Sequence, residues 1–216
     1  MCILANAILY RLLNLPGAFI CRYYSGGFQL KRNYCLVAAW LLCVVHMSIA
    51  LAGDPIEEPR DYRMEDYDAP VPEQLSGATT VDAFDVKRLL DDHDALVIDV
   101  IPEHRKPEFL PENQIWIPPD HLGVVGSIWL PDVGYGVLSD TATKYFKDNL
   151  EKYTHSNKDH PVVFYCRMDC WMSWNAGKRA LSYGYTNVHW FSYGIDGWNF
   201  EDFEVQPLKA EPGDRQ

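Results

Sequence analysis

Short apolar runs that alternate with helix-like segments are the feature that most constrains this fold. Three of these runs are continuous, at 95–100 (ALVIDV), 161–166 (PVVFYC) and 187–191 (NVHWF). Continuous apolar runs rich in branched and aromatic residues are typical of strands that are covered on both faces, as in parallel sheets. The alternation therefore predicts the α/β class, with a parallel β-sheet and helices on both faces.

Three segments beside these strands carry helix signals. Ser139 is an N-cap residue before a segment whose apolar residues recur on one face. The helix predicted for 173–183 ends at Gly184, which suits the C′ position. A shorter helix follows the capping-box spacing of Thr79 and Asp82. The helix after Ser139 has an apolar face made of Ala142, Phe146, Leu150 and Tyr153. The shorter helix has one made of Ala83, Val86 and Leu90.

A long loop interrupts the alternation. Residues 101–125 contain five prolines and lead to a further predicted strand at 126–131 (GSIWLP). Loops of this length in a compact domain are usually functional or are insertions particular to a family.

The first 52 residues differ in composition from the rest. They contain four basic residues and no acidic one, and Lys31-Arg32 precedes the apolar run 34–50. Ala50-Leu51-Ala52 has the small-x-small pattern that signal peptidase accepts. We expect a secretory signal that is cleaved after Ala52, which leaves no membrane span; an uncleaved anchor is the alternative. Residues 1–30 add a second apolar stretch, so either translation starts near Leu30 or the signal has an unusually long n-region.

Cleavage would leave a strongly acidic protein. The whole chain has 19 basic and 30 acidic residues, and removal of the four basic residues before Gly53 gives 15 minus 30, or −15. This charge disfavours nucleic acid and anionic lipid as partners and favours a basic protein. We predict an acidic, proline-rich arm over 53–77 that ties onto the domain or stays mobile, a domain over 78–205 and a tail over 206–216.

Only two of the six cysteines, Cys166 and Cys170, lie after the predicted cleavage site. Two thiols are too few for a disulfide framework, so a reactive role is expected. Cys166 ends a predicted strand and precedes a helix, where backbone N–H groups and the helix dipole favour a thiolate. Ligands bind beyond the carboxyl ends of the strands in such sheets. We therefore predict that Cys166 is a redox-active nucleophile.

The role of Cys170 has three alternatives. On one regular helix the two Cβ atoms would lie ~6 Å apart, beyond the ~4 Å that a disulfide needs. A curled loop would bring them together, and a bridge closing so few residues suits a redox or relay role. Cys170 then forms a reversible disulfide with Cys166 or resolves a persulfide or sulfenate on it. The third alternative is that it packs passively.

The residues around the cysteine pair resemble the rhodanese-like domain family. The strand ending in Tyr165-Cys166, the loop, the helix and 184–198 (GYTNVHWFSYGIDGW) resemble the C-terminal half of a rhodanese domain. LVIDV (96–100) and VGSIWLP (125–131) resemble first-half signatures, and the similarity covers about 78–203. In rhodaneses the loop cysteine takes a sulfane sulfur as a persulfide, held by loop amides, and passes it to a thiophilic acceptor. The resemblance implies this sulfurtransferase role for Cys166.

Within this family the sequence resembles the PQQ-dependent catabolism-associated CXXCW motif proteins. The resemblance rests on APVP (69–72), VGYG (133–136) and the stretch CRMDCWMSWNAGKR, which has three residues between its cysteines instead of two. It implies a periplasmic protein, accessory to PQQ-dependent alcohol oxidation, with a quinoprotein dehydrogenase or cytochrome c as partner. We expect no cofactor, because the sequence has no recognisable set of residues for calcium or a quinone. The alternatives are a non-catalytic docking protein, which uses the Trp-rich loop, and a thiol-disulfide redox partner.

The active loop departs from the common rhodanese pattern. That pattern has Gly three residues and Arg five residues after the cysteine, where this chain has Asp169 and Trp171. We expect Asp169 to be a buried carboxylate, and neither it nor an indole suits a thiosulfate dianion. Arg167, Lys178 or Arg179 would have to replace the missing cation, although the last two suit a solvated helix face.

Further residues are assigned to the predicted active loop and pocket. Asp99 either orients loop groups or caps the turn after its strand. The helical spacing of Trp174 is typical of a core residue. The alternative is that Trp171 and Trp174 wall off a small dry pocket or form a docking face. After residue 52, no two histidines have the spacing that would place both on one face of a helix as metal ligands, so no metal site is expected. If a metal does bind, His121 in the long loop is the first candidate ligand. The other assigned residues are Met168, Met172, Ser173 and, at the rim, Tyr135.

Overall fold

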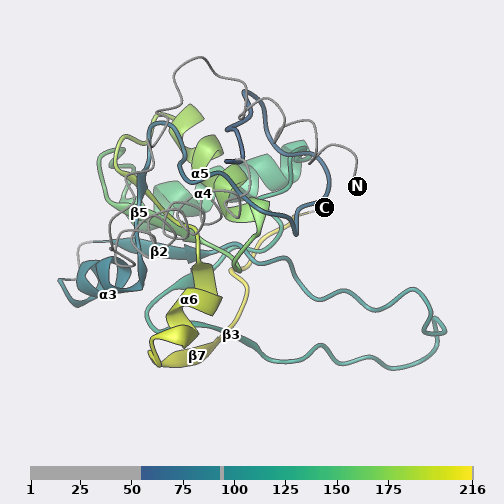
Figure 1. Cartoon of the computed structure of the whole chain (residues 1–216). Coiled ribbons are helices and arrows are strands. Elements are labelled where there is room, and N and C mark those ends of the chain that lie inside the picture. Colours follow the sequence, from purple (N-terminus) through teal and green to yellow (C-terminus); the bar gives the residue numbers. More distant parts are fainter. Residues whose placement is uncertain (1–54, 93–94, 216) are drawn as a thin grey trace, which may run out of the picture. The chain divides into compact units, whose positions relative to one another are not determined.

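A parallel sheet with the strand order β1-β6-β5-β2-β4 forms the centre of the protein (Figure 1). The structure is a computed structural model that describes residues 55–92 and 95–215, and these fall within one compact unit, Asp54–Gln216. The predicted signal sequence lies outside the described residues. The strands are β1 (Thr79–Thr80), β2 (Leu96–Asp99), β4 (Ile128–Trp129), β5 (Val162–Tyr165) and β6 (Val188–Phe191).

The predicted α/β class with a parallel sheet is confirmed. Each of the four strands expected from the sequence is present, although each is shorter than its apolar run. Within this sheet, β1 is the strand that the sequence does not predict; its two residues pair with β6 and extend the sheet at that edge. Such a short strand has too few residues to show an apolar alternation.

Helices cover both faces of the sheet (Figure 1). Phe164 of β5 packs against Phe146 of α4, whereas the ring of the next residue, Tyr165, lies against Phe191 and Val124 on the opposite face. Successive strand residues point to opposite faces, so both faces of β5 are buried. The helices are α3 (Ala83–Asp91), α4 (Asp140–Thr154), α5 (Trp171–Ser182) and α6 (Gly194–Phe200).

The helix ends follow the expected chemistry with one correction. Ser139 caps α4 by accepting a hydrogen bond from the Ala142 N–H at 3.0 Å, as predicted. The N-cap of α3 is Asp82 rather than Thr79, and Asp82 and Asp85 form the capping box. Thr79 is unavailable as a cap because its backbone pairs with β6. Gly184, with φ of 89°, follows α5 in the left-handed region as expected.

A second, two-stranded sheet lies outside the elements that the sequence predicts. β3 (His121–Val124), at the end of the long loop, pairs antiparallel with β7 (Val205–Leu208). Beyond β7, the Glu211 N–H donates to the Trp129 carbonyl at 3.0 Å, so the segment predicted as a tail is attached to the sheet edge. No helix in the described part of the chain is long and apolar enough to cross a membrane.

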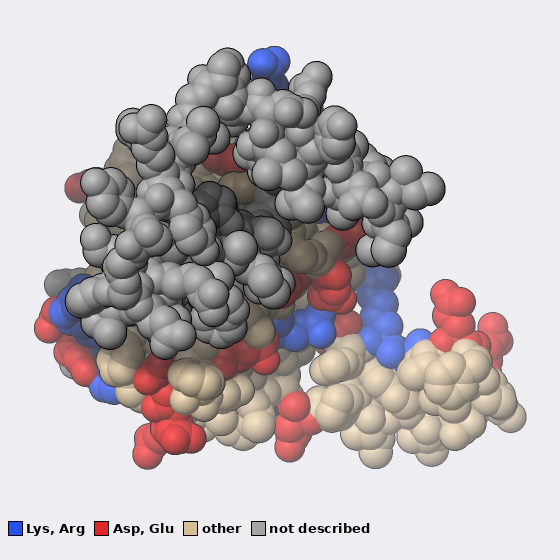
Figure 2. Space-filling model, in the orientation of Figure 1, with Lys and Arg blue, Asp and Glu red and all other residues tan. Residues whose placement is uncertain are grey.

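The described part of the acidic arm packs along α5. Lys178 donates to the Pro59 carbonyl at 3.0 Å, and the Trp174 indole N–H donates to the Gln74 carbonyl at 3.3 Å. Both ends of the described arm are thereby fastened to the same helix. In the view of Figure 2, Asp and Glu side chains are scattered over the described surface among Lys, Arg and other residues.

Candidate active site

The cysteine loop connects the central strand β5 to α5. Cys166 directly follows β5, and Cys170 is the N-cap residue of α5, with an extended backbone conformation. The Ile195 N–H donates to the Cys166 carbonyl at 2.8 Å, and a Cβ on Gly194 would collide with that carbonyl. The close approach requires glycine at position 194, whose φ is 51°. This contact joins the start of α6 to the start of the loop.

The two cysteines form a disulfide in this structure, with Cα atoms 6.2 Å apart. Only Cys170 borders the helix, so the curled loop brings the sulfur atoms together, which a regular helix would not. Both residues are buried, with exposed fractions of 0 % for Cys166 and 1 % for Cys170. A reagent therefore needs a movement of the loop or the arm to reach either sulfur.

The three residues between the cysteines are exposed, and two of them have acidic partners. The Met168 N–H donates to Asp196 of α6 at 2.8 Å. The Arg167 guanidinium donates to Asp68 of the arm at 2.9 Å, so this cation is already paired with a carboxylate. Carboxylates thus engage one loop amide and the one basic side chain of the loop.

Asp169 is exposed, so the expectation of a buried carboxylate is wrong. Its φ is 53°, in the left-handed region. Asp adopts this region more readily than most residues. Asp169 stands at the place where the rhodanese loop pattern has Gly, and its backbone conformation is compatible with that replacement.

The arm covers one side of the cysteine loop. The Trp171 backbone N–H donates to the Tyr67 carbonyl at 2.8 Å, and its indole N–H donates to the Pro70 carbonyl at 3.2 Å. Asp68 also forms an isolated antiparallel bridge with Cys170. The arm segment 67–70 therefore lies on the residues that begin α5.

The tryptophans of this region belong to a buried cluster. Trp171 and Trp174 pack edge to face, with ring centroids 5.3 Å apart, together with Leu75 and Trp190. The core role expected for Trp174 is confirmed. Trp171 is also buried and does not form an open docking face. Tyr135, expected at the rim, packs its ring against Tyr67 of the arm.

The expectation that Lys178 and Arg179 lie on a solvated helix face is wrong. Arg179 is only 4 % exposed and donates to the carbonyls of the turn that follows β4. Lys178 is partly buried, and its ammonium group lies 4.5 Å from the ring centroid of Trp174. The arm and the turn cover this face, which a helical pattern alone does not reveal. The carbonyls bound by Arg179 are those of Val133, Tyr135 and Gly136.

Three further residues of α5 have positioning roles. Asn175, which no sequence pattern singles out, binds both the N–H and the carbonyl of Arg63, at 2.9 and 2.8 Å, and also the Gly134 carbonyl. Buried Ser173 accepts a hydrogen bond from the Trp190 indole at 3.0 Å. The backbone of Met172 lies so close to Gly134 that a Cβ there would collide with it. The predicted pocket residues Met172 and Ser173 thus anchor the helix.

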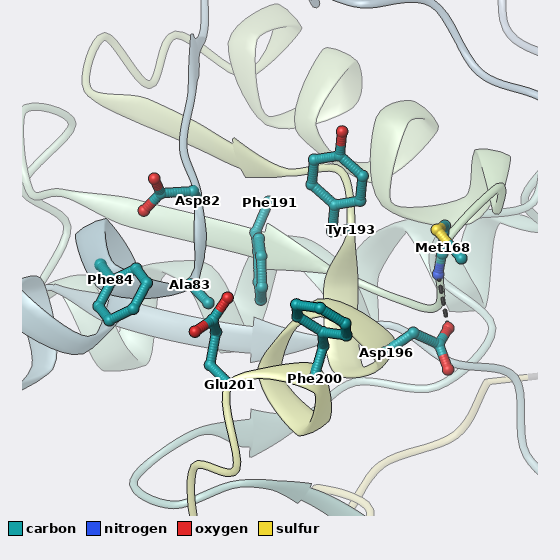
Figure 3. Close-up of a pocket in the computed structure, with 10 residues that line it drawn as sticks. Asp82, Ala83, Phe84, Met168, Phe191, Tyr193, Asp196, Phe200 and Glu201 are labelled. Carbon is teal, nitrogen blue, oxygen red and sulfur yellow. Dashed lines mark hydrogen bonds between the residues drawn. The ribbon is translucent and has the colours of Figure 1, made fainter.

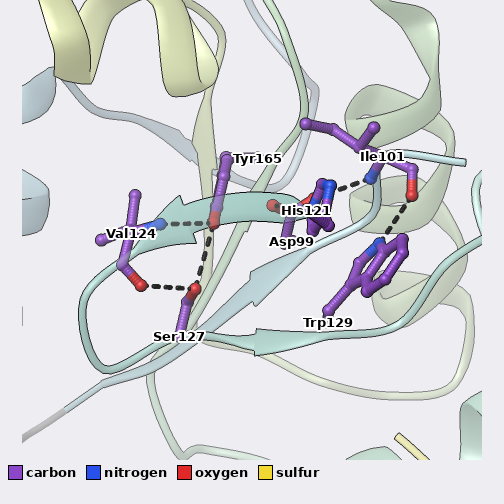
Figure 4. A network of polar contacts seen from close by, with 7 residues as sticks. All are labelled: Asp99, Ile101, His121, Val124, Ser127, Trp129 and Tyr165. Carbon is purple, nitrogen blue, oxygen red and sulfur yellow. Dashed lines mark hydrogen bonds and ion pairs between the residues drawn. The ribbon is translucent and has the colours of Figure 1, made fainter. Parts of the chain in front are cut away.

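Asp99 lies at the carboxyl end of β2 within a buried polar network (Figure 4). One of its oxygens accepts the Ile101 N–H at 2.8 Å, and the other lies 2.9 Å from His121 Nε2. The hydrogen bond from Ile101 corresponds to the alternative in which Asp99 caps the turn after its strand. The His121 ring stacks on Trp129 with centroids 3.9 Å apart. Burial raises the pKa of the Asp99 carboxyl, although the hydrogen bond with His121 opposes the rise.

Tyr165, the residue before Cys166, joins the same network (Figure 4). Its hydroxyl accepts the Val124 N–H at 3.0 Å and lies 3.0 Å from the Ser127 hydroxyl. Burial, followed by the charge of Asp99, raises the pKa of Tyr165 well above its usual value. These bonds fix the end of β5 directly before the cysteine. Within the described ranges, no three His, Cys, Asp or Glu side chains are placed to hold a metal ion.

A cavity of about 440 Å³ lies beside the cysteine loop (Figure 3). Met168 of the loop forms part of its wall, opposite Ala83 and Phe84 at the start of α3. Phe191 at the end of β6 and Tyr193 before α6 also line the cavity. Sequence reasoning missed this cavity because its lining comes from three stretches that are far apart in the chain, 82–84, 168 and 191–201.

Comparisons with known proteins place the chain in a family. The sequence matches the family described as "Rhodanese-like domain" over residues 82–201, which is more than half of the chain. No curated protein matches it.

Solved structures give weaker likenesses. A thiosulfate sulfurtransferase from Pseudomonas aeruginosa is 16% identical with a TM-score of 0.43, over 62% of this chain and 21% of that one. SseA from Escherichia coli, a 3-mercaptopyruvate sulfotransferase, is 17% identical with a TM-score of 0.46, over 63% and 53%. The polysulfide-sulfur transferase from Wolinella succinogenes is 18% identical with a TM-score of 0.38, over 61% and 80%. On the sequence match, the chain belongs to the rhodanese-like domain family.

Proposed function

We propose that this protein carries sulfane sulfur on Cys166 and that Cys170 resolves the resulting persulfide. The observation that carries the proposal is the Cys166–Cys170 bond in the loop between β5 and α5 of a rhodanese-like domain. Membership of the rhodanese-like domain family, over residues 82–201, supports a function of the sulfur-transfer type.

The first step needs Cys166 as a thiolate. A free thiol has a pKa of ~8.5, so only a few per cent is ionised at neutral pH. Cys166 follows the carboxyl end of β5, and its bond to Cys170 shows that its sulfur reaches the N-cap of α5, where the helix dipole favours the charged form. The thiolate attacks the outer sulfur of a donor persulfide, the donor S–S bond breaks, and the donor leaves as a thiolate. The products are a Cys166 persulfide and the donor thiol, without net oxidation.

The second step uses Cys170. Its thiolate attacks Sγ of the Cys166 persulfide, forms the Cys166–Cys170 disulfide and expels the outer sulfur as hydrosulfide. The sulfane sulfur gains two electrons and the two cysteine thiols lose them, so no external oxidant is required. A dithiol reductant then restores both thiols. Alternatively, an acceptor thiolate attacks the outer sulfur first and carries it away.

We propose secretion to the periplasm and a task accessory to PQQ-dependent alcohol oxidation. The signal-like segment before Gly53 and the disulfide support the location, because disulfides persist in oxidising compartments. The association with a quinoprotein dehydrogenase or cytochrome c rests on the sequence resemblance alone. The alternative of docking through the Trp-rich loop has less support, because Trp171 and Trp174 are buried beneath the arm.

Sulfide release tests this proposal against a purely redox role. Reduced protein is mixed with cysteamine persulfide and a dithiol, and hydrosulfide is measured over time. We expect repeated release by the wild type and loss of the protein-dependent release in Cys166→Ser. If the wild type exchanges its disulfide with the dithiol but releases no hydrosulfide above the protein-free rate, the sulfur-carrier function is wrong and a thiol-disulfide role remains.

A further inference from the structure

The cavity beside Met168 is part of the same structural unit as the cysteine ring. Met168 lies inside the ring that the Cys166–Cys170 bond closes, and its side chain lines the cavity (Figure 3). The Met168 N–H is held by Asp196 of α6, and the Cys166 carbonyl is held by the Ile195 N–H. A molecule in the cavity therefore contacts the loop that must move when either cysteine reacts.

The walls of the cavity are apolar. Phe191 and Ala83 are buried at its base, whereas Phe84, Tyr193 and Phe200 expose large parts of their rings. Phe200 is 84 % exposed although it belongs to α6, whose Ile195 and Trp198 are buried in the domain. A space of about 440 Å³ with such walls is in the range that holds a small organic molecule.

The charged residues that line the cavity, among those that the structure describes, are all acidic. Asp82, Asp196 and Glu201 line it, and none of the described residues that line it is Lys or Arg. The nearby guanidinium of Arg167 is paired with Asp68. The residues from Gly53 onward also carry an excess of 15 acidic over basic side chains, from 30 minus 15. An anion entering the cavity therefore meets repulsion from these carboxylates, and no described lining residue supplies a cation to offset it.

We propose that this cavity selects the small thiol compound with which the Cys166–Cys170 pair reacts. It takes compounds with an apolar or cationic group beside the sulfur and disfavours anionic ones. The proposal rests on the proposed function, because it names the class of compound used by that site. It also predicts that thiosulfate, a dianion, is a poor donor.

Reduction of the disulfide by three thiols tests the selectivity. Phenylethanethiol, cysteamine and mercaptopropionate supply an apolar, a cationic and an anionic group, respectively. Each rate is divided by that thiol's rate with hydroxyethyl disulfide, an uncharged reference that corrects for intrinsic nucleophilicity. Any opening of the loop or arm is common to the three thiols and cancels in their ratios. We expect normalised rates at low salt about tenfold or more higher for the first two thiols than for mercaptopropionate.

Two variants assign the selectivity to the cavity. Phe200→Ser should lower the normalised rate with phenylethanethiol about fivefold and leave cysteamine unchanged, because it removes apolar contact only. Phe109→Ser is the matched control, since Phe109 is 83 % exposed and lies outside the cavity lining. Asp196→Asn keeps an oxygen that accepts the Met168 N–H but removes one charge. It should raise the rate with mercaptopropionate relative to cysteamine about threefold.

Equal normalised rates for the three thiols would overturn the proposal. So would an equal effect of Phe200→Ser and Phe109→Ser, or an unchanged charge preference in Asp196→Asn. The thiol experiment involves no sulfane sulfur. A failure of hydrosulfide release therefore contradicts the proposed function while leaving the cavity's selectivity intact, and uniform thiol rates contradict the selectivity alone.

Discussion

Asp99 shows how burial controls a single carboxyl group. It is fully buried, and the titratable side chains that contact it are His121 of β3 and Tyr165 of β5. Burial raises its pKa above the ordinary 3.8, so folding favours the protonated form. Protonation of Asp99 therefore stabilises the folded state relative to the unfolded state. This contribution to the free energy of unfolding is fully present below pH 3.8 and is lost as the pH rises through the higher pKa of the folded state.

We expect Asp99→Asn to remove this pH dependence. The free energy of unfolding of the wild type relative to the variant should fall as the pH rises above about 4, because only the wild type has to ionise a buried group. Denaturant unfolding at a series of pH values measures the difference. Asp202→Asn, at an exposed position, is the control and should run parallel to the wild type. Parallel curves for Asp99→Asn would contradict the assignment.

At the scale of elements, the arm and α5 behave as one unit held by Asn175. This side chain binds both backbone groups of Arg63 in the arm and the Gly134 carbonyl in the turn after β4. The Trp171 N–H and indole add two more bonds to the arm. The arm therefore covers the cysteine loop through hydrogen bonds that depend on a few positions.

Asn175→Ala should loosen the arm. Loss of three hydrogen bonds predicts a decrease of about 2 to 3 kcal/mol in the free energy of unfolding. Backbone amides of residues 61–70 should exchange hydrogen faster, and the disulfide should be reduced more quickly. Hydrogen exchange followed by mass spectrometry measures the first effect. Asn113→Ala, in the exposed long loop, should change neither, and unchanged exchange in Asn175→Ala would show that the arm is held elsewhere.

The sequence was sufficient to predict the elements whose signals are local. β2, β5 and β6 have continuous apolar runs. Ser139 marks the start of α4, and Gly184 marks the end of α5. The antiparallel pair of β3 and β7 was missed because β3 ends a proline-rich loop and β7 contains Pro207. The two glycines in α6 likewise obscured its helical pattern.

The candidate site was only partly predictable for a related reason. The position of Cys166 after a strand follows from the sequence around it. The partners of the loop do not, because Asp68 is almost one hundred residues away and Asp196 belongs to an unpredicted helix. The prediction that Arg179 is exposed to solvent was wrong for the same reason, because this side chain is buried by tertiary contacts with the turn after β4.

At the scale of the whole molecule, we expect the mature protein to begin at Gly53. Expression of the full chain in a bacterial host, followed by N-terminal sequencing of the periplasmic fraction, tests this expectation. Recovery of the chain from the membrane fraction with residues 1–52 attached would instead support the uncleaved anchor.

The central claim is that Cys166 carries sulfur and Cys170 removes it. Mass spectrometry of reduced Cys170→Ser protein after brief exposure to cysteamine persulfide tests the claim most directly. We predict a stable gain of one sulfur atom on the peptide that contains Cys166, and no gain in Cys166→Ser. The wild type should instead lose two hydrogen atoms as its disulfide forms. Absence of the added sulfur in Cys170→Ser would contradict the account.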